Sequence, residues 1–205
     1  MGYLPIRVST IKSDIKLGFD VFVQLPHRAM KYAHGSDDVE GHRIAYLKSK
    51  KVRKLYINES DELKYQDYID RCLSHVMQDD SVSLDDKANL VIGAGEATAE
   101  RIYEDPHSKK SYDAAQGTAT NLINVLGQSD ELLKGIFDRT ITEEDDTTEN
   151  RMQKHSVNTS SLAISFAESL GLSQEKIELL GVAGLFHDVA ISQYEGDEKK
   201  LFVRA

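Results

Sequence analysis

The sequence contains a single cysteine, Cys72, among its 205 residues. One cysteine excludes a disulfide framework and a cysteine-based zinc site, and it suits a reducing compartment. No apolar run reaches the roughly 18 residues that a membrane span requires, and the N-terminus lacks the apolar block of a signal peptide. We therefore expect a cytoplasmic protein without a membrane span.

Positive charge is also scarce, because 25 Lys and Arg face 34 Asp and Glu, which gives a formal net charge of −9. Nucleic acids bind clustered positive charge, so this balance argues against a DNA-binding protein. The 40% of hydrophobic residues can bury a core. The length suits one domain with a small additional module.

The first part of the chain mixes strand and helix signals. Short runs rich in β-branched and aromatic residues alternate with amphipathic segments. The expected elements are strands at 3–8, 20–25 and 54–57, and helices over 37–50 and 61–77. They predict a small mixed α/β module at 1–78. This module is a candidate contact site for a protein partner.

The rest of the chain shows helical periodicity. Ser83 followed by Asp86 resembles a helix cap, and apolar stripes continue to Leu126. An acidic stretch at 130–150 carries most of the net charge, and two final helices are expected from about 153 to 170 and from 173 to 188. We predict an all-helical domain over 79–205, and therefore an α+β protein overall.

Two histidines are placed so that a tight turn brings them to the same level. Gly171 is typical of a helix end and Ser173 of the next helix cap, so the final two helices should be antiparallel neighbours. At about 1.5 Å per residue, His155 lies about 24 Å before the turn and His187 about 21 Å after it. Both imidazoles should therefore meet beside the carboxylate of Asp188.

Apolar residues accompany both histidines at helical spacing, which predicts that both imidazoles face the seam between the helices. These residues are Leu162, Phe166 and Leu170 on the first helix and Ile177, Leu180 and Gly184 on the second. Two imidazoles and one carboxylate can hold a divalent metal ion. A core histidine without a ligand has the same pattern, so the residues alone leave both interpretations open.

Three segments carry a resemblance to a known family: KHSVN at 154–158, LGLS at 170–173 and GVAGLFHDV at 181–189. They resemble the opening of an HD-GYP domain, a branch of the HD superfamily of metal-dependent phosphohydrolases. The step from His155 to His187 is the one that the family uses. The resemblance is close over 150–190 and looser upstream, and the 1–78 module is similar to accessory domains that precede some HD-GYP domains.

The resemblance implies a centre of two or three divalent ions, of iron or manganese. His155 and His187 would be histidine ligands, and Asp188 would be the catalytic carboxylate that bridges two of the ions. It also implies hydrolysis of the bacterial signalling messenger cyclic di-GMP, or of a related nucleotide.

After Asp188 the sequence departs from the family. The segment 189–192, Val-Ala-Ile-Ser, stands where the family has a Gly-Lys step, and no histidine or proline follows it. Three ligands can hold one ion but do not complete a two-metal centre. We therefore expect an incomplete HD-type domain, either a piece of a longer protein or a truncated form, which is inactive by itself and needs ligands from outside this chain.

Two alternatives to a cyclic di-GMP phosphodiesterase stay open. One is a non-catalytic HD-fold binding or interaction protein, and the other is a general HD phosphohydrolase that acts on ordinary nucleotides. The remaining features favour structural interpretations. We expect a solvated helix end for the cations at 48–54, a solvated acidic loop at 143–146, core packing for Cys72, and association with a second copy through the apolar residues at 201–203.

Overall fold

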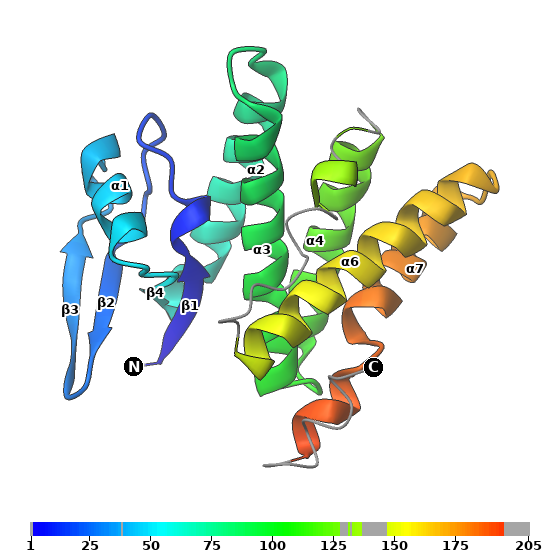
Figure 1. Cartoon of the computed structure of the whole chain (residues 1–205). Helices are drawn as coiled ribbons and strands as arrows, with labels where there is room; N and C mark the ends of the chain where they lie inside the picture. The colour runs from blue at the N-terminus through cyan, green and yellow to red at the C-terminus, as the bar shows by residue number, and fades with distance from the viewer. Residues whose placement is uncertain (1, 38, 128–130, 132, 137–146, 195–205) are drawn as a thin grey trace. The chain divides into compact units, whose positions relative to one another are not determined.

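The computed structural model describes residues 2–37, 39–127, 131, 133–136 and 147–194 (Figure 1). The chain forms two compact units, 1–94 and 95–205, and the division falls within helix α3 (Leu84–Glu104). From the sequence we expect a domain boundary between residues 78 and 79, and this boundary stays a prediction. The acidic loop at 143–146 and the apolar residues at 201–203 lie outside the described residues.

The N-terminal unit contains a four-stranded antiparallel sheet in the order β1-β4-β2-β3. Its strands are β1 (Tyr3–Arg7), β2 (Val21–Leu25), β3 (Arg28–Ala33) and β4 (Lys54–Asn58). The sequence predicted three of them and missed β3. This strand lies at the sheet edge, and Ala33 is its one fully buried residue. An edge strand with so little burial does not need alternating apolar residues, which are the signal by which strands are recognised in a sequence.

Two helices complete this unit together with the first half of α3. Helix α1 (Gly41–Ser49) places Ile44 and Leu47 beside buried residues of the sheet, and α2 (Glu62–Gln78) buries the face that contains Tyr68 and Cys72. Leu63, which the periodicity places near that face, is 79% exposed. It precedes Tyr65 by two residues and therefore points to the opposite side of the helix.

The C-terminal unit is helical, which confirms the predicted α+β class. The second half of α3 is followed by α4 (Lys109–Leu126), α6 (Thr148–Ser169), α7 (Gln174–Phe186) and a 3₁₀ turn, η3 (Val189–Gln193). Their core contains Ile102, Ala115, Ala119, Val182 and Leu185. None of the helices in the described part of the chain is long and apolar enough to cross a membrane.

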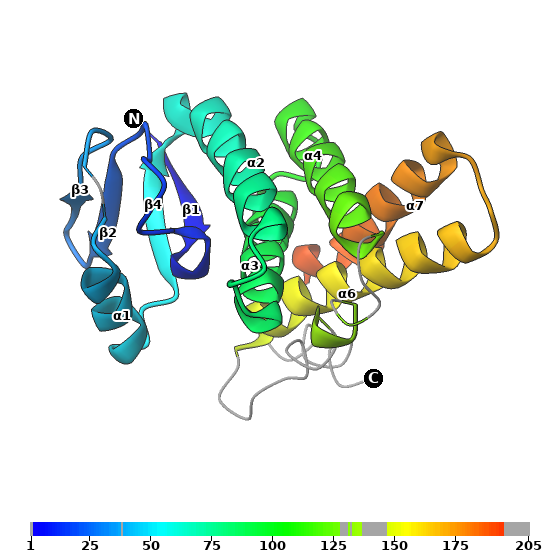
Figure 2. The same ribbon diagram turned by 90° about the horizontal axis from the view of Figure 1, so that it is seen from above.

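Helices α6 and α7 lie side by side, joined by the short turn at Gly171 (Figure 2). Gly171 has a φ of 65°, and its N–H donates to the carbonyl of Glu168 at 2.9 Å. The N–H of Leu172 donates to the carbonyl of Ala167 at 3.1 Å. These two bonds satisfy carbonyls at the helix end and reverse the chain, as the glycine predicted.

The two helices approach closely because glycines of α7 face α6. A Cβ atom at Gly184 would lie 2.5 Å from the Cα of Ser160, and one at Gly181 would lie 2.9 Å from Ile164. The hydroxyl of Ser160 also donates to the carbonyl of Gly181 at 2.7 Å. Small residues therefore set the distance between the helices that carry the two histidines.

Replacing Gly184 with alanine is expected to destabilise the protein by about 1–3 kcal/mol, because the methyl group meets the backbone of α6. The thermal midpoint should fall by about 2–4 °C for each kcal/mol. The control is Gly41→Ala, where the nearest atom to the new methyl group would be 3.8 Å away. Equal midpoints for Gly184→Ala and the wild type would contradict this packing.

Cys72 is fully buried, and burial raises the pKa of its thiol to about 11. Since the thiolate is the reactive form, a thiol reagent near pH ~8 should leave the folded protein unmodified and label the chain in urea. Mass spectrometry gives the labelled fraction at this single cysteine. Rapid labelling of the folded protein would rule out the core position.

Candidate metal centre

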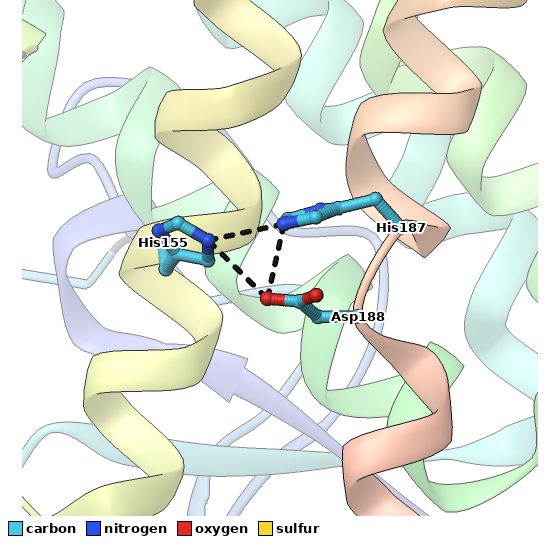
Figure 3. Close-up of side chains that lie close together, drawn as sticks. All are labelled: His155, His187 and Asp188. Carbon is cyan, nitrogen blue, oxygen red and sulfur yellow. Dashed lines mark hydrogen bonds and ion pairs between the residues drawn. The ribbon is translucent and has the colours of Figure 1, made fainter. Parts of the chain in front are cut away.

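Three side chains that the sequence singled out meet at one point (Figure 3). The Nε2 atoms of His155 and His187 lie 3.0 Å apart. Oδ2 of Asp188 lies 3.3 Å from Nε2 of His155 and 3.0 Å from Nε2 of His187. Within the described part of the chain, this is the one group of three such side chains close enough to share an ion.

Contacts outside the site hold the segments that supply the three side chains. His155 lies in the first half of α6, which begins after a cap in which the N–H of Asn150 donates to the hydroxyl of Thr147. His187 follows the last residue of α7, and Asp188 begins the η3 turn. Val189 packs against the core of the unit, so the chain on both sides of Asp188 is anchored.

The ring of His187 is oriented by its own helix. Its Nδ1 lies 2.7 Å from the carbonyl oxygen of Gly184, which can only accept a hydrogen bond. Nδ1 therefore carries a proton, and in the neutral imidazole Nε2 presents a lone pair to His155 and Asp188. A backbone carbonyl that fixes the tautomer in this way is a common support for a metal-binding histidine.

The position of the site differs from the predicted seam. On α6, Leu162, Phe166 and Leu170 are 52%, 67% and 59% exposed, and the His155 side chain is 57% exposed. On α7, Ile177 and Gly184 are buried but Leu180 is 39% exposed. The prediction for α6 was wrong because its buried face contains the small polar residues Ser156, Ser160 and Ser161. The three side chains thus lie at the open edge of the helix pair.

The three atoms fit one divalent ion. Two ligands that bind an ion at about 2.1 Å, about 90° apart, lie about 3.0 Å from each other. The three observed separations are 3.0, 3.0 and 3.3 Å. The donor set of two imidazoles and one carboxylate suits iron, manganese and zinc. The remaining positions around such an ion would face solvent, where a water or a substrate could bind.

Tyr103 is a neighbour of the site that the sequence did not indicate. Its hydroxyl lies 2.6 Å from the hydroxyl of Ser156, the residue after His155. Burial raises the pKa of Tyr103, and the negative charge of Asp188 raises it further. A tyrosine within a helical stripe has no distinctive spacing to either histidine, so only the fold brings it here.

The cations at 48–54 lie in the N-terminal unit, where α1 ends. Lys51 has a φ of 56°, the conformation of a residue that closes a helix, and the ammonium group of Lys50 lies 5.6 Å from the ring centre of Tyr46. These features agree with a solvated helix end.

No family model and no curated protein matches the sequence. Among solved structures, the chain is similar to Bd1817, a HDG"Y"P protein from Bdellovibrio bacteriovorus, with 26% sequence identity and a TM-score of 0.62. The alignment covers 98% of this chain and 68% of that one. The similarity thus includes the N-terminal unit as well as the helices that carry the histidines.

The hydrogen bond to Gly184 predicts the tautomer of His187. In the metal-free protein at alkaline pH, the proton of the neutral ring should be on Nδ1, because the carbonyl of Gly184 needs a donor. Long-range ¹H–¹⁵N spectra distinguish the two ring nitrogens. A proton on Nε2 with Nδ1 unprotonated would contradict the geometry described for this ring.

Proposed function

We propose that this chain, which belongs to an HD-GYP-like family of HD-type phosphohydrolases, supplies three ligands to the metal centre of a phosphodiesterase whose substrate is cyclic di-GMP. The single observation that carries the proposal is the group formed by His155, His187 and Asp188. The three atoms that face one another lie within 3.3 Å and come from α6 and from the two residues that follow α7.

In this proposal His155, His187 and Asp188 would hold a divalent ion, iron or manganese, with the atoms that face one another. Oδ2 is the carboxylate oxygen that contacts the imidazoles (Figure 3). The other oxygen, Oδ1, would be available to a second ion. Ligands for that second ion would come from outside the described residues.

A bound divalent ion supplies a water of lowered pKa and positive charge for the phosphoryl oxygens. The residues of the chain hold the geometry for this chemistry. Gly184 fixes the His187 ring, and the close approach of α7 to Ser160 keeps the two histidines opposite each other. Asp188 is one third exposed, so an ion from solvent can reach its carboxylate.

The negative net charge of the protein repels an anionic substrate, so bound cations are needed to neutralise the site. The net charge is −9, and a dinucleotide carries two negative phosphates. Metal ions are the largest local charges in such a site and reverse the local potential. The His155 side chain is 57% exposed, so it is accessible from solvent.

A non-catalytic HD-fold protein that binds one ion is the second candidate. It is favoured by the number of ligands, because the described residues offer three and a two-metal centre needs more. The Val-Ala-Ile-Ser segment in place of a Gly-Lys step points the same way. A general nucleotide phosphohydrolase would use the same three residues, so only a substrate comparison separates it from the leading proposal.

The test is a titration of the 205-residue chain with Mn²⁺ and Fe²⁺ under anaerobic conditions. A hydrolysis assay follows, on the longest native reading frame that contains this chain, with cyclic di-GMP and other cyclic and linear nucleotides. We expect the wild type to bind metal, and His187→Ala and Asp188→Asn to weaken binding by about 100-fold or more, because the first removes a ligand and the second removes the negative charge. The matched control is His107→Ala, an exposed histidine of the same unit.

The outcomes separate the candidates. Metal-dependent loss of cyclic di-GMP that Asp188→Asn abolishes supports the phosphodiesterase. Equal turnover of ordinary nucleotides supports the general phosphohydrolase, and metal binding without hydrolysis supports the non-catalytic protein. A wild-type chain that binds no metal, or a His187→Ala variant that binds it unchanged, would overturn the proposed site.

A further inference from the structure

We infer that Tyr103 is a positioning residue of the metal centre, and that its hydroxyl group acts through Ser156 on the segment of α6 that carries His155. The inference rests on the proposed function of His155, His187 and Asp188 as metal ligands. It adds a residue from a third helix, α3, to a site built by α6 and the end of α7.

The two histidines are held in different ways. The His187 ring is fixed through Nδ1 by the carbonyl of Gly184, at 2.7 Å. The His155 ring makes its contacts through Nε2 to the other two ligands, and its side chain is 57% exposed. The place of Nε2 of His155 therefore depends mainly on where the backbone of α6 puts it.

The backbone of α6 beside His155 is held against α3 by two neighbouring contacts. The hydroxyl groups of Tyr103 and Ser156 lie 2.6 Å apart, and Ser156 is fully buried. One residue further, Val157 packs so closely that a Cβ atom at Gly95 would lie 2.7 Å from it. The apolar contact sets the distance between the helices, and the polar contact fixes the rotation of α6 about its axis.

Loss of the Tyr103 hydroxyl would leave the buried hydroxyl of Ser156 without this partner. A serine within a helix then bonds to a carbonyl of the preceding turn, which bends the helix locally. Metal–ligand distances in protein sites lie within about 0.2 Å of their standard values, so we expect a small rotation of α6 at position 155 to lower metal affinity. Tyr103 also lies near enough to Asp188 for that charge to raise its pKa, which agrees with a place beside the centre.

The experiment is a Mn²⁺ titration of Tyr103→Phe, Ser156→Ala and the double variant. Tyr103→Phe keeps the ring and removes the hydroxyl, and we expect it to weaken binding by about 10-fold, the lower range for a group that supports a ligand. Ser156→Ala should have a similar effect, and the double variant should bind no more weakly than either single variant. Tyr112→Phe, an exposed tyrosine of α4, is the matched control and should bind like the wild type.

A second readout does not need metal. In the metal-free protein, Tyr103→Phe should shift the imidazole ¹H–¹⁵N signals of His155 and leave those of His107 unchanged. Thermal midpoints of all variants show whether a loss of affinity merely reflects unfolding.

Wild-type affinity in Tyr103→Phe, or effects of the two single substitutions that multiply in the double variant, would overturn the inference. If the wild type binds no metal, the proposed function fails, and the His155 signals alone decide the role of Tyr103. Unchanged His155 signals would then count against it.

Discussion

The close approach of α7 to α6 at Gly184 and Ser160 is the contact on which the candidate site depends. Gly184 faces the backbone of Ser160, and the hydroxyl of Ser160 donates to the carbonyl of Gly181, one turn before Gly184 on α7. A larger side chain at Gly181 or Gly184 would separate the helices. Since the two imidazoles belong to different helices, their 3.0 Å separation is a consequence of this packing.

The location of the three candidate ligands at an exposed edge has an energetic reason. Burial of two imidazoles and a carboxylate without an ion would cost several kcal/mol, because each group loses its hydration. At the edge of the helix pair, the Asp188 side chain stays 33% exposed and the His155 side chain 57% exposed. The ligand group is thus compatible with a folded metal-free chain and is open to an incoming ion.

The sequence predicted what depends on local pattern. Gly171 and Ser173 identified the turn, the α+β class followed from periodicity, and counting residues from the turn brought the two histidines to one level. It failed where tertiary packing overrides pattern. The buried face of α6 uses serines, so the larger apolar residues indicated the wrong face, and Leu162 and Phe166 are exposed. Tyr103 joins the site through the fold alone.

The site is supported unequally on its two sides, and this asymmetry follows from where each histidine lies. His187 is at the end of a helix, where a carbonyl one turn back is free to accept a bond from its ring. His155 is inside a helix, where the backbone carbonyls are already paired, so its orientation has to be set by packing of the whole segment. That packing comes from α3, through Val157 at Gly95 and Ser156 at Tyr103. The geometry of the candidate metal centre therefore depends on α3, a helix that supplies none of its three side chains.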